Sequence, residues 1–170
     1  MILSDKDIKR CLRERTIQII PAPEDAQIDT TTIDLRIGEP IWEWNPELLK
    51  TPGLDLSVDL DEIDYLKLSS SYLLKVEKER SGQYVVEPHR FYLAPTFEKV
   101  GLPTTSKIAA RVEGRSTLGR LGLVVHMTAP TIHSGYGATK DKGPGIITLE
   151  IFNYGPFKIC VTPGRRLFVN

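Results

Sequence analysis

The sequence is poor in the residues that build metal sites and disulfide frameworks. It has two cysteines, Cys11 and Cys160, and three histidines among its 170 residues. Two cysteines make neither a disulfide framework nor a structural zinc site, and three histidines offer little material for a metal centre. The composition therefore predicts no protein-bound metal site, and it favours a reducing, cytoplasmic location.

Net charge and long apolar segments are also missing. Lys plus Arg and Asp plus Glu are both 22, so no overall field draws the molecule onto nucleic acid or an anionic membrane. No apolar run approaches the roughly 20 residues that a membrane span needs, and no apolar signal segment follows Met1. We therefore expect neither a nucleic-acid partner nor a membrane, and an anionic ligand would have to meet a local group of cations.

Helical patterns are scarce, so the chain is predicted to be mainly β. The exceptions are an opening helix, with Ser4 and Asp7 in a capping-box pattern and an end near Arg15, and one short helical turn near Ser116. A strand is predicted within 30–38, where apolar and polar residues alternate. Further short β-type runs cover 71–77, 83–88, 90–100, 107–114, 123–130, 145–153 and 157–170.

This spacing of strands is typical of a sandwich or barrel, and we expect one domain over residues 1–170. Residues 39–68 contain three prolines and Gly53, so they are predicted to be an irregular insertion. The acidic run at 55–64 is predicted to be a solvent-exposed face of that insertion rather than a site.

The short stretch from Val112 to Pro130 contains two arginines, a serine and a threonine between glycines. A helical turn over 115–122 would offer free N–H groups to a phosphate, with Ser116 and Thr117 able to cap it and Arg115 adding donors. Arg115 and Arg120 would point about 140° apart on such a turn. They therefore fit two tasks, or two neighbouring subunits, better than one shared phosphate. A capped surface turn with solvated arginines is the alternative.

The strand at 145–153 carries a glutamate between apolar neighbours. Ile146, Thr148, Glu150 and Phe152 would share one face, and both faces are mostly apolar, which predicts burial on both sides. A carboxylate there needs a partner, for which Arg120 is a candidate, and burial would suit it to proton transfer. A purely structural buried ion pair is the alternative.

Taken in order, these segments resemble the dCTP deaminases of the dUTPase superfamily. The similarity is carried by "GRSTLGRLGL" (114–123), "HMTA" (126–129) and "ITLE" (147–150), with support from "TTTIDLRIG", "RFYLAPT" and the opening "MILSDKDI". It implies a distorted β-barrel or jelly-roll fold of the dUTPase-like type. It also implies a homotrimer with sites at subunit interfaces, and deamination of dCTP to dUTP and ammonia without zinc.

By position, the resemblance assigns Glu150 as general base and proton shuttle. Ser116 and the carbonyl of Ala129 would hold the attacking water, and Arg120 would orient Glu150. The nucleotide would be bound through its triphosphate, which carries Mg²⁺, its sugar and its pyrimidine edge. The binding residues implied are Arg115, Ser116, Thr117, Leu118, Gly119, Arg120, His133, Tyr136, Thr148, Leu149 and Glu150.

Three features depart from the family pattern. His133 occupies the place of an aspartate that accepts the sugar hydroxyl, although a neutral imidazole nitrogen can also accept. Residues 137–144 look like an insertion beside the pocket, and the C-terminal arm that closes over the nucleotide is not found before Asn170. The alternatives kept open are a dUTPase or bifunctional enzyme that forms dUMP, a same-fold enzyme acting on a related nucleotide, and a non-catalytic nucleotide-binding trimer.

Overall fold

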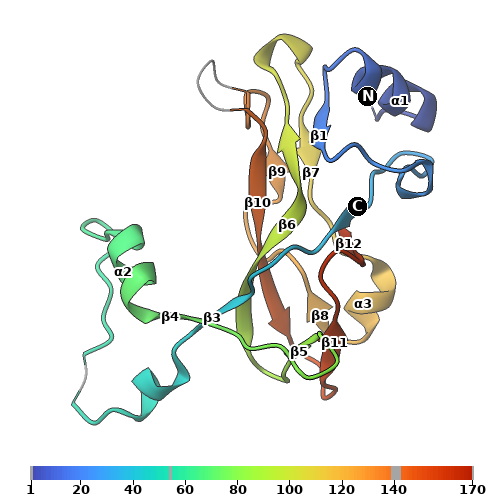
Figure 1. The fold of residues 1–170 in the computed structure, drawn as a ribbon. Coiled ribbons are helices and arrows are strands. Elements are labelled where there is room, and N and C mark those ends of the chain that lie inside the picture. Colours follow the sequence, from blue (N-terminus) through green and yellow to red (C-terminus); the bar gives the residue numbers. More distant parts are fainter. Residues whose placement is uncertain (1, 54, 139–142, 170) are drawn as a thin grey trace.

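The computed structural model describes residues 2–53, 55–138 and 143–169, and it is mainly β with few short helices (Figure 1). The helices are α1 (Asp5–Arg13), α2 (Tyr65–Tyr72) and α3 (Ser116–Arg120), with 3₁₀ turns η1 (Asp25–Gln27), η2 (Pro46–Lys50) and η3 (Thr104–Ser106). The strands are β1 (Gln18–Ile20), β2 (Leu35–Arg36), β3 (Trp42–Trp44), β4 (Leu73–Lys75), β5 (Tyr84–Val86), β6 (Phe91–Gly101), β7 (Ala110–Arg111), β8 (Leu123–Val124), β9 (Thr131–Ile132), β10 (Gly145–Asn153), β11 (Ile159–Val161) and β12 (Arg166–Val169).

The longest strands, β6 and β10, form the centre of a six-stranded sheet. Its path runs β4-β3-β6-β10-β8, and β1 also pairs with β6. Three two-stranded sheets accompany it, made of β5 with β11, β2 with β12, and β7 with β9. Within 30–38, where the sequence predicts a strand, the structure has only β2 at Leu35–Arg36, so the strand is much shorter than expected. Among the described residues the strands do not close into a barrel, so the coarser expectation of a mainly β fold is the part confirmed.

The opening helix forms where the capping pattern placed it. The Ser4 side chain accepts from the Asp7 backbone N–H at 3.3 Å, and Asp7 in turn accepts from the Ser4 backbone. Ile8 and Cys11 are the buried residues of this helix. Both cysteines are free thiols, Cys11 buried and Cys160 exposed. In the part of the chain that the structure describes, no helix has the length and apolar character to cross a membrane.

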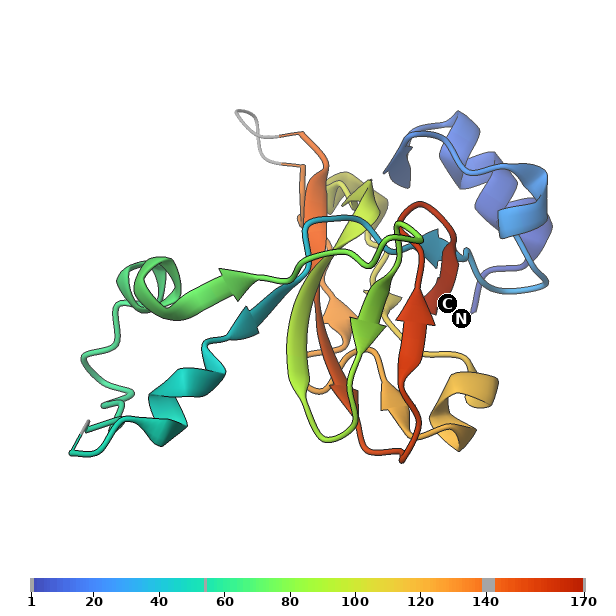
Figure 2. The ribbon, with the colours of Figure 1, turned by 60° about the horizontal axis from the view of Figure 1, so that its bottom comes forward.

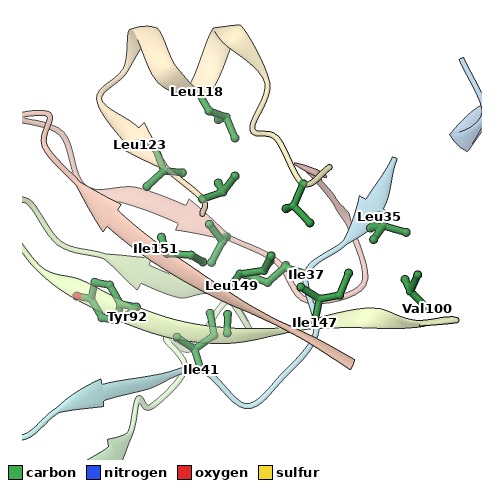
Figure 3. Packing of buried hydrophobic residues seen from close by; sticks show 14 of the residues in the cluster. Leu35, Ile37, Ile41, Tyr92, Val100, Leu118, Leu123, Ile147, Leu149 and Ile151 are labelled. Carbon is green, nitrogen blue, oxygen red and sulfur yellow. The ribbon is translucent and has the colours of Figure 1, made fainter. Parts of the chain in front are cut away.

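The core lies on one side of β10 only. Ile147, Leu149 and Ile151 point into it, where they meet side chains such as Tyr92 and Ile37 (Figure 3). The opposite face of the strand is exposed or half-buried, with Ile146 47% exposed. The expectation that β10 is buried on both faces was therefore wrong. Apolar residues on the outer face misled it, because an apolar side chain can also lie at the surface.

The predicted insertion at 39–68 forms most of an arm that projects from the body, and the arm continues past it through the end of α2 and β4 (Figures 1 and 2). Its helix α2 was not predicted: Asp64 caps it by accepting from the Lys67 backbone N–H at 3.1 Å. No residue of α2 is buried, so this helix does not pack into the core. The described residues of the acidic run at 55–64 are exposed, as expected.

A buried carboxylate ties β2 to β6. Glu98 is fully buried, and it accepts from the backbone N–H and the Nε of Arg36 at 2.7 and 2.6 Å. The buried Gln27 side chain also donates to Glu98, at 3.2 Å. Burying a charge is tolerated only when it is paired and hydrogen-bonded, and here both conditions are met. This network therefore holds β2 against β6.

Candidate active site

Glu150 lies on the outer face of β10, half-buried rather than enclosed. The strand is held against β6 in an antiparallel register in which Glu150 faces Leu93 and Thr148 faces Pro95. The register shifts between Ile146 and Thr148, and the Ile147 N–H there bonds the side chain of Thr96 at 3.1 Å instead of a strand partner. This irregularity bends the strand beside Thr148, as β-bulges do next to many sites.

The side chain of Glu150 is held by a threonine. The Thr128 backbone N–H donates to Glu150 Oε2 at 2.9 Å, and the Thr128 hydroxyl lies 3.1 and 3.3 Å from the two carboxylate oxygens. Within one chain, and among the residues that the structure describes, Arg120 forms no ion pair with Glu150, and the carboxylate is bonded by Thr128. Sequence reasoning quoted Thr128 within "HMTA" but gave it no role. The loop geometry that brings it to β10 has no sequence signal.

A cavity of about 340 Å³ is lined by sequence neighbours of Glu150 and Thr128, although Glu150 itself is not among its lining residues. Thr148, two residues from Glu150 on the same strand face, contributes to its wall, and so does Ala129, which follows Thr128. The volume suits a small organic ligand, since such pockets begin near 300 Å³. The lining residues are Val112, His126, Ala129, Thr131, Ile132, His133, Tyr136, Ile147 and Thr148.

The loop between β8 and β9 contributes His126 and Ala129 to the lining of the cavity. Ala129 has a positive φ of 45°, which is uncommon for a residue with a side chain and is often found at functional sites. Its carbonyl accepts from His126 Nε2 at 3.3 Å, while the other ring nitrogen, Nδ1, is buried and has no hydrogen-bond partner among the described residues. His126 therefore joins the candidate site, although it had been named only as part of a motif.

Tyr136 closes one end of the cavity. Its hydroxyl donates to the Ile146 carbonyl at 2.6 Å, and its backbone carbonyl accepts from Leu102 at 2.8 Å. Burial raises the pKa of the Tyr136 hydroxyl, so this group stays protonated and keeps donating at neutral pH. His133, two residues after β9 begins, lines the same cavity and remains exposed. Of the expected insertion at 137–144, residues 139–142 lie outside the described residues.

The predicted helical turn near Ser116 is α3, but its cap differs from the expected one. Arg115 is the residue at the N-cap, without a side-chain capping bond, and Ser116 is the first helical residue. Leu118 is buried in the core and anchors the turn (Figure 3), while Ser116, Thr117, Gly119 and Arg120 are exposed. Gly122 ends the turn with a φ of 87°, and a Cβ there would lie 2.4 Å from the Gly155 backbone nitrogen.

Arg115 forms an ion pair with Asp34, a buried residue that sequence reasoning had not singled out. Asp34 belongs to the alternating segment 30–38, where it was read only as one of the polar positions. No local signal could have predicted its partner, because 81 residues separate the two.

A single chain thus brings together only part of the predicted site. Ala129, His133, Tyr136 and Thr148 line the cavity. Glu150 follows Thr148 on the same strand face without lining the cavity, and Leu149 points into the core. The α3 residues predicted to hold water and phosphate do not line this cavity in the described part of the chain. Among the described residues, no group of three or more His, Cys, Asp or Glu side chains is placed to hold a metal ion.

Comparison with known proteins identifies the family of this sequence. The sequence matches the family described as dCTP deaminase-like over residues 2–168. A relative from Methanosphaera stadtmanae named "dCTP deaminase, dUMP-forming" is 38% identical over 166 residues, which are 98% of this chain and 75% of the relative. A relative from Haloarcula marismortui named "dCTP deaminase" is 36% identical over 168 residues, covering 98% of this chain and 77% of that protein.

The fold has a solved counterpart. The crystal structure of a 2′-deoxycytidine 5′-triphosphate deaminase from Agrobacterium tumefaciens superposes with a TM-score of 0.65 at 22% sequence identity. The match covers 99% of this chain and 46% of that chain, so this chain spans about half of that protein's length. At this level of identity the likeness establishes the fold alone.

Proposed function

This chain belongs to the dCTP deaminase-like family, and on that premise we propose that it converts dCTP and water to dUTP and ammonia. The observation that carries the proposal is the position of Glu150. It is a half-buried carboxylate fixed by Thr128, and Thr148, two residues earlier on the same strand face, lines a cavity together with Ala129, His133 and Tyr136.

In the proposed reaction Glu150 acts as general base and then as general acid. It takes a proton from the attacking water, and the hydroxide adds to C4 of the cytosine ring. The same carboxyl group passes this proton to ring N3 as the hydroxide adds. It then moves the proton of the new C4 hydroxyl to the amino group, which leaves as ammonia, and a carbonyl remains at C4. The two bonds from Thr128 fix the carboxylate orientation, and the Ala129 carbonyl next to Thr128 is a suitable acceptor for the water.

We propose that a second copy of the chain completes the site, in a homotrimer. Support comes from the separation of the predicted residues, because Ser116 and Arg120 are exposed on α3 and do not line the cavity beside Glu150. Two exposed donors on one chain and an incomplete cavity on another are the arrangement that an intersubunit site requires. Arg120 would then reach Glu150 of a neighbouring chain, which keeps the role that the sequence suggested.

The triphosphate would be bound at Arg115 and the first turn of α3, over Ser116, Thr117, Leu118 and Gly119. Magnesium would arrive with it, because Mg²⁺ keeps several of its waters and is commonly held by substrate phosphates. The absence of a three-ligand cluster among the described residues is compatible with a metal bound in this way. At the other end, Tyr136 and His133 would contact the sugar, and the Thr148 and Leu149 backbone the pyrimidine edge.

The second candidate is a bifunctional reaction that continues from dUTP to dUMP and pyrophosphate. It is favoured by the name of the Methanosphaera stadtmanae relative, which is described as dUMP-forming. His133 bears on the choice between the two candidates. It lines the cavity at the position where the family pattern has an aspartate that accepts the sugar hydroxyl.

One incubation separates the two candidates. The purified protein is mixed with dCTP and Mg²⁺, and ammonia, dUTP, dUMP and pyrophosphate are measured over time. Deamination alone gives ammonia and dUTP in equal amounts, whereas the bifunctional reaction gives ammonia, dUMP and pyrophosphate. Nucleotide binding without ammonia release would contradict both and would leave a non-catalytic binding protein.

A further inference from the structure

The partner of Arg115 is a buried acid on a different part of the chain. Asp34 precedes β2, its side chain is only 5% exposed, and its Oδ2 accepts from the Arg115 guanidinium. The Arg115 side chain is 39% exposed, so the pair has one buried end and one end that reaches the surface beside α3. Burying a carboxylate costs free energy unless a cation or hydrogen-bond donors pair with it.

Asp34 is itself rigidly held. Its backbone N–H donates to the Gln27 carbonyl at 2.7 Å, and its own carbonyl accepts from the Gln27 side chain at 2.8 Å. Gln27 is 2% exposed and also bonds Glu98, which in turn binds Arg36. The carboxylate that faces Arg115 therefore extends from a buried polar network, and it cannot follow the arginine if the arginine moves.

We propose that Asp34 is a positioning residue for triphosphate binding: it holds the Arg115 guanidinium in the orientation that meets the phosphates. The inference rests on the proposed function, which places the triphosphate at Arg115. An arginine side chain has many accessible rotamers, and a ligand that must order it loses affinity for that reason. A guanidinium has five N–H donors in a planar fork, so one edge can bind a carboxylate while another faces a second anion.

Asp34 also has the opposite electrostatic effect, which makes the sign of its removal informative. Its negative charge weakens the local attraction for phosphate, so removing the charge alone would tighten binding. Removing an anchor would loosen binding. The two roles therefore predict changes of opposite direction for the same variant, Asp34→Asn, which keeps the side-chain shape and removes the charge.

The chain offers a matched control in the ion pair of Glu43 and Arg90. The Glu43 side chain is 17% exposed and the Arg90 side chain 37%, against 5% for Asp34 and 39% for Arg115. Glu43 lies on β3, which Figure 1 shows apart from α3. Glu43→Gln should lower the melting temperature without changing triphosphate affinity. It thus reports what the loss of one part-buried arginine pair does to the fold in general.

The experiment measures the Kd of inorganic tripolyphosphate by calorimetry, together with kcat and KM for dCTP, for the wild type, Asp34→Asn, Arg115→Ala, the double variant and Glu43→Gln. We expect Asp34→Asn to raise the tripolyphosphate Kd and the dCTP KM about tenfold, the size of one misplaced charged hydrogen bond, with kcat changed less than about twofold. The double variant should bind no more weakly than Arg115→Ala alone, because Asp34 acts through Arg115.

Three results would overturn the inference: tighter or unchanged tripolyphosphate binding in Asp34→Asn, additive losses in the double variant, or an equal loss in Glu43→Gln. If Asp34→Asn shows no cooperative melting, Asp34→Glu takes its place, since it keeps the charge and moves the carboxylate by one methylene. A raised Kd then supports positioning, and an unchanged Kd contradicts it. Tripolyphosphate binding without ammonia release from dCTP would sink the proposed deaminase function and leave the Asp34 comparison readable.

Discussion

The two faces of β10 divide the strand between the core and the proposed site. On the inner face Ile147, Leu149 and Ile151 are buried in the core, and on the outer face Ile146 is 47% exposed and Glu150 is half-buried. Successive side chains of a strand point to opposite sides, so a packed core and a reactive carboxylate can follow one another along nine residues. The core side fixes the backbone, and the backbone fixes where the carboxylate stands.

The contrast also explains why Glu150 suits proton transfer better than Glu98 on the neighbouring strand. Glu98 is fully buried and takes three hydrogen bonds from Arg36 and Gln27, so its oxygens have structural work and no contact with solvent. Glu150 is held by Thr128 alone among the described residues and remains accessible. A general base has to reach its proton, and only the second arrangement permits that.

The largest effect should come from the outer face, by Glu150→Gln. An amide has nearly the same shape but cannot shuttle a proton, so kcat should fall about 10³-fold or more. Steady-state ammonia release from dCTP measures kcat, and calorimetry with dCTP should show binding within a few-fold of the wild type. Near-normal turnover in this variant would show that another group is the base. The outer face of β10 would then have no catalytic role.

The inner face should respond through stability instead. Ile151→Ala leaves a cavity in the core beneath the strand and should cost about 3 kcal/mol of unfolding free energy, within the 2–5 kcal/mol typical of such truncations. Urea titration followed by circular dichroism measures the loss, and kcat per folded molecule should stay close to the wild type. A large fall in kcat with little loss of stability would mean that the two faces are not separable.

A smaller effect is expected at the residue that holds Glu150. Thr128→Val is nearly isosteric, removes the hydroxyl bond and keeps the backbone N–H bond to Oε2. We expect kcat to fall about tenfold, which corresponds to roughly 1.4 kcal/mol. Thr128→Ser keeps the hydroxyl and serves as the control, which should recover most of the activity. Equal activity of the valine and serine variants would contradict an orienting role for this hydroxyl.

The smallest effect should come from the exposed end of the outer face. Ile146→Thr keeps a β-branched side chain on a strand and replaces the ethyl branch of a 47% exposed side chain with a hydroxyl, so stability should change by less than about 0.5 kcal/mol. The same urea titration measures it at low protein concentration. A much larger loss would show that a second copy of the chain covers this residue in solution.

The short helical turn shows how far local patterns reach. The sequence placed it correctly at 115–122, because glycines bound it and an apolar residue, Leu118, marks its buried side. It misassigned the cap, since Arg115 rather than a hydroxyl residue occupies that position. It could not find Asp34 as the partner of Arg115, because ion pairs between distant segments leave no periodic signal in one sequence.

The amino-acid sequence determined the mainly β class, the opening helix with its cap, the limits of β10 and the identity of its two alternating faces. These features follow from local preferences and from side-chain periods of 2 and 3.6 residues, which any short window displays. The tertiary structure alone decided which face of β10 meets the core, which residue bonds Glu150, and which buried acid pairs with Arg115. Each of these depends on contacts between segments far apart along the chain, and only packing brings such segments together.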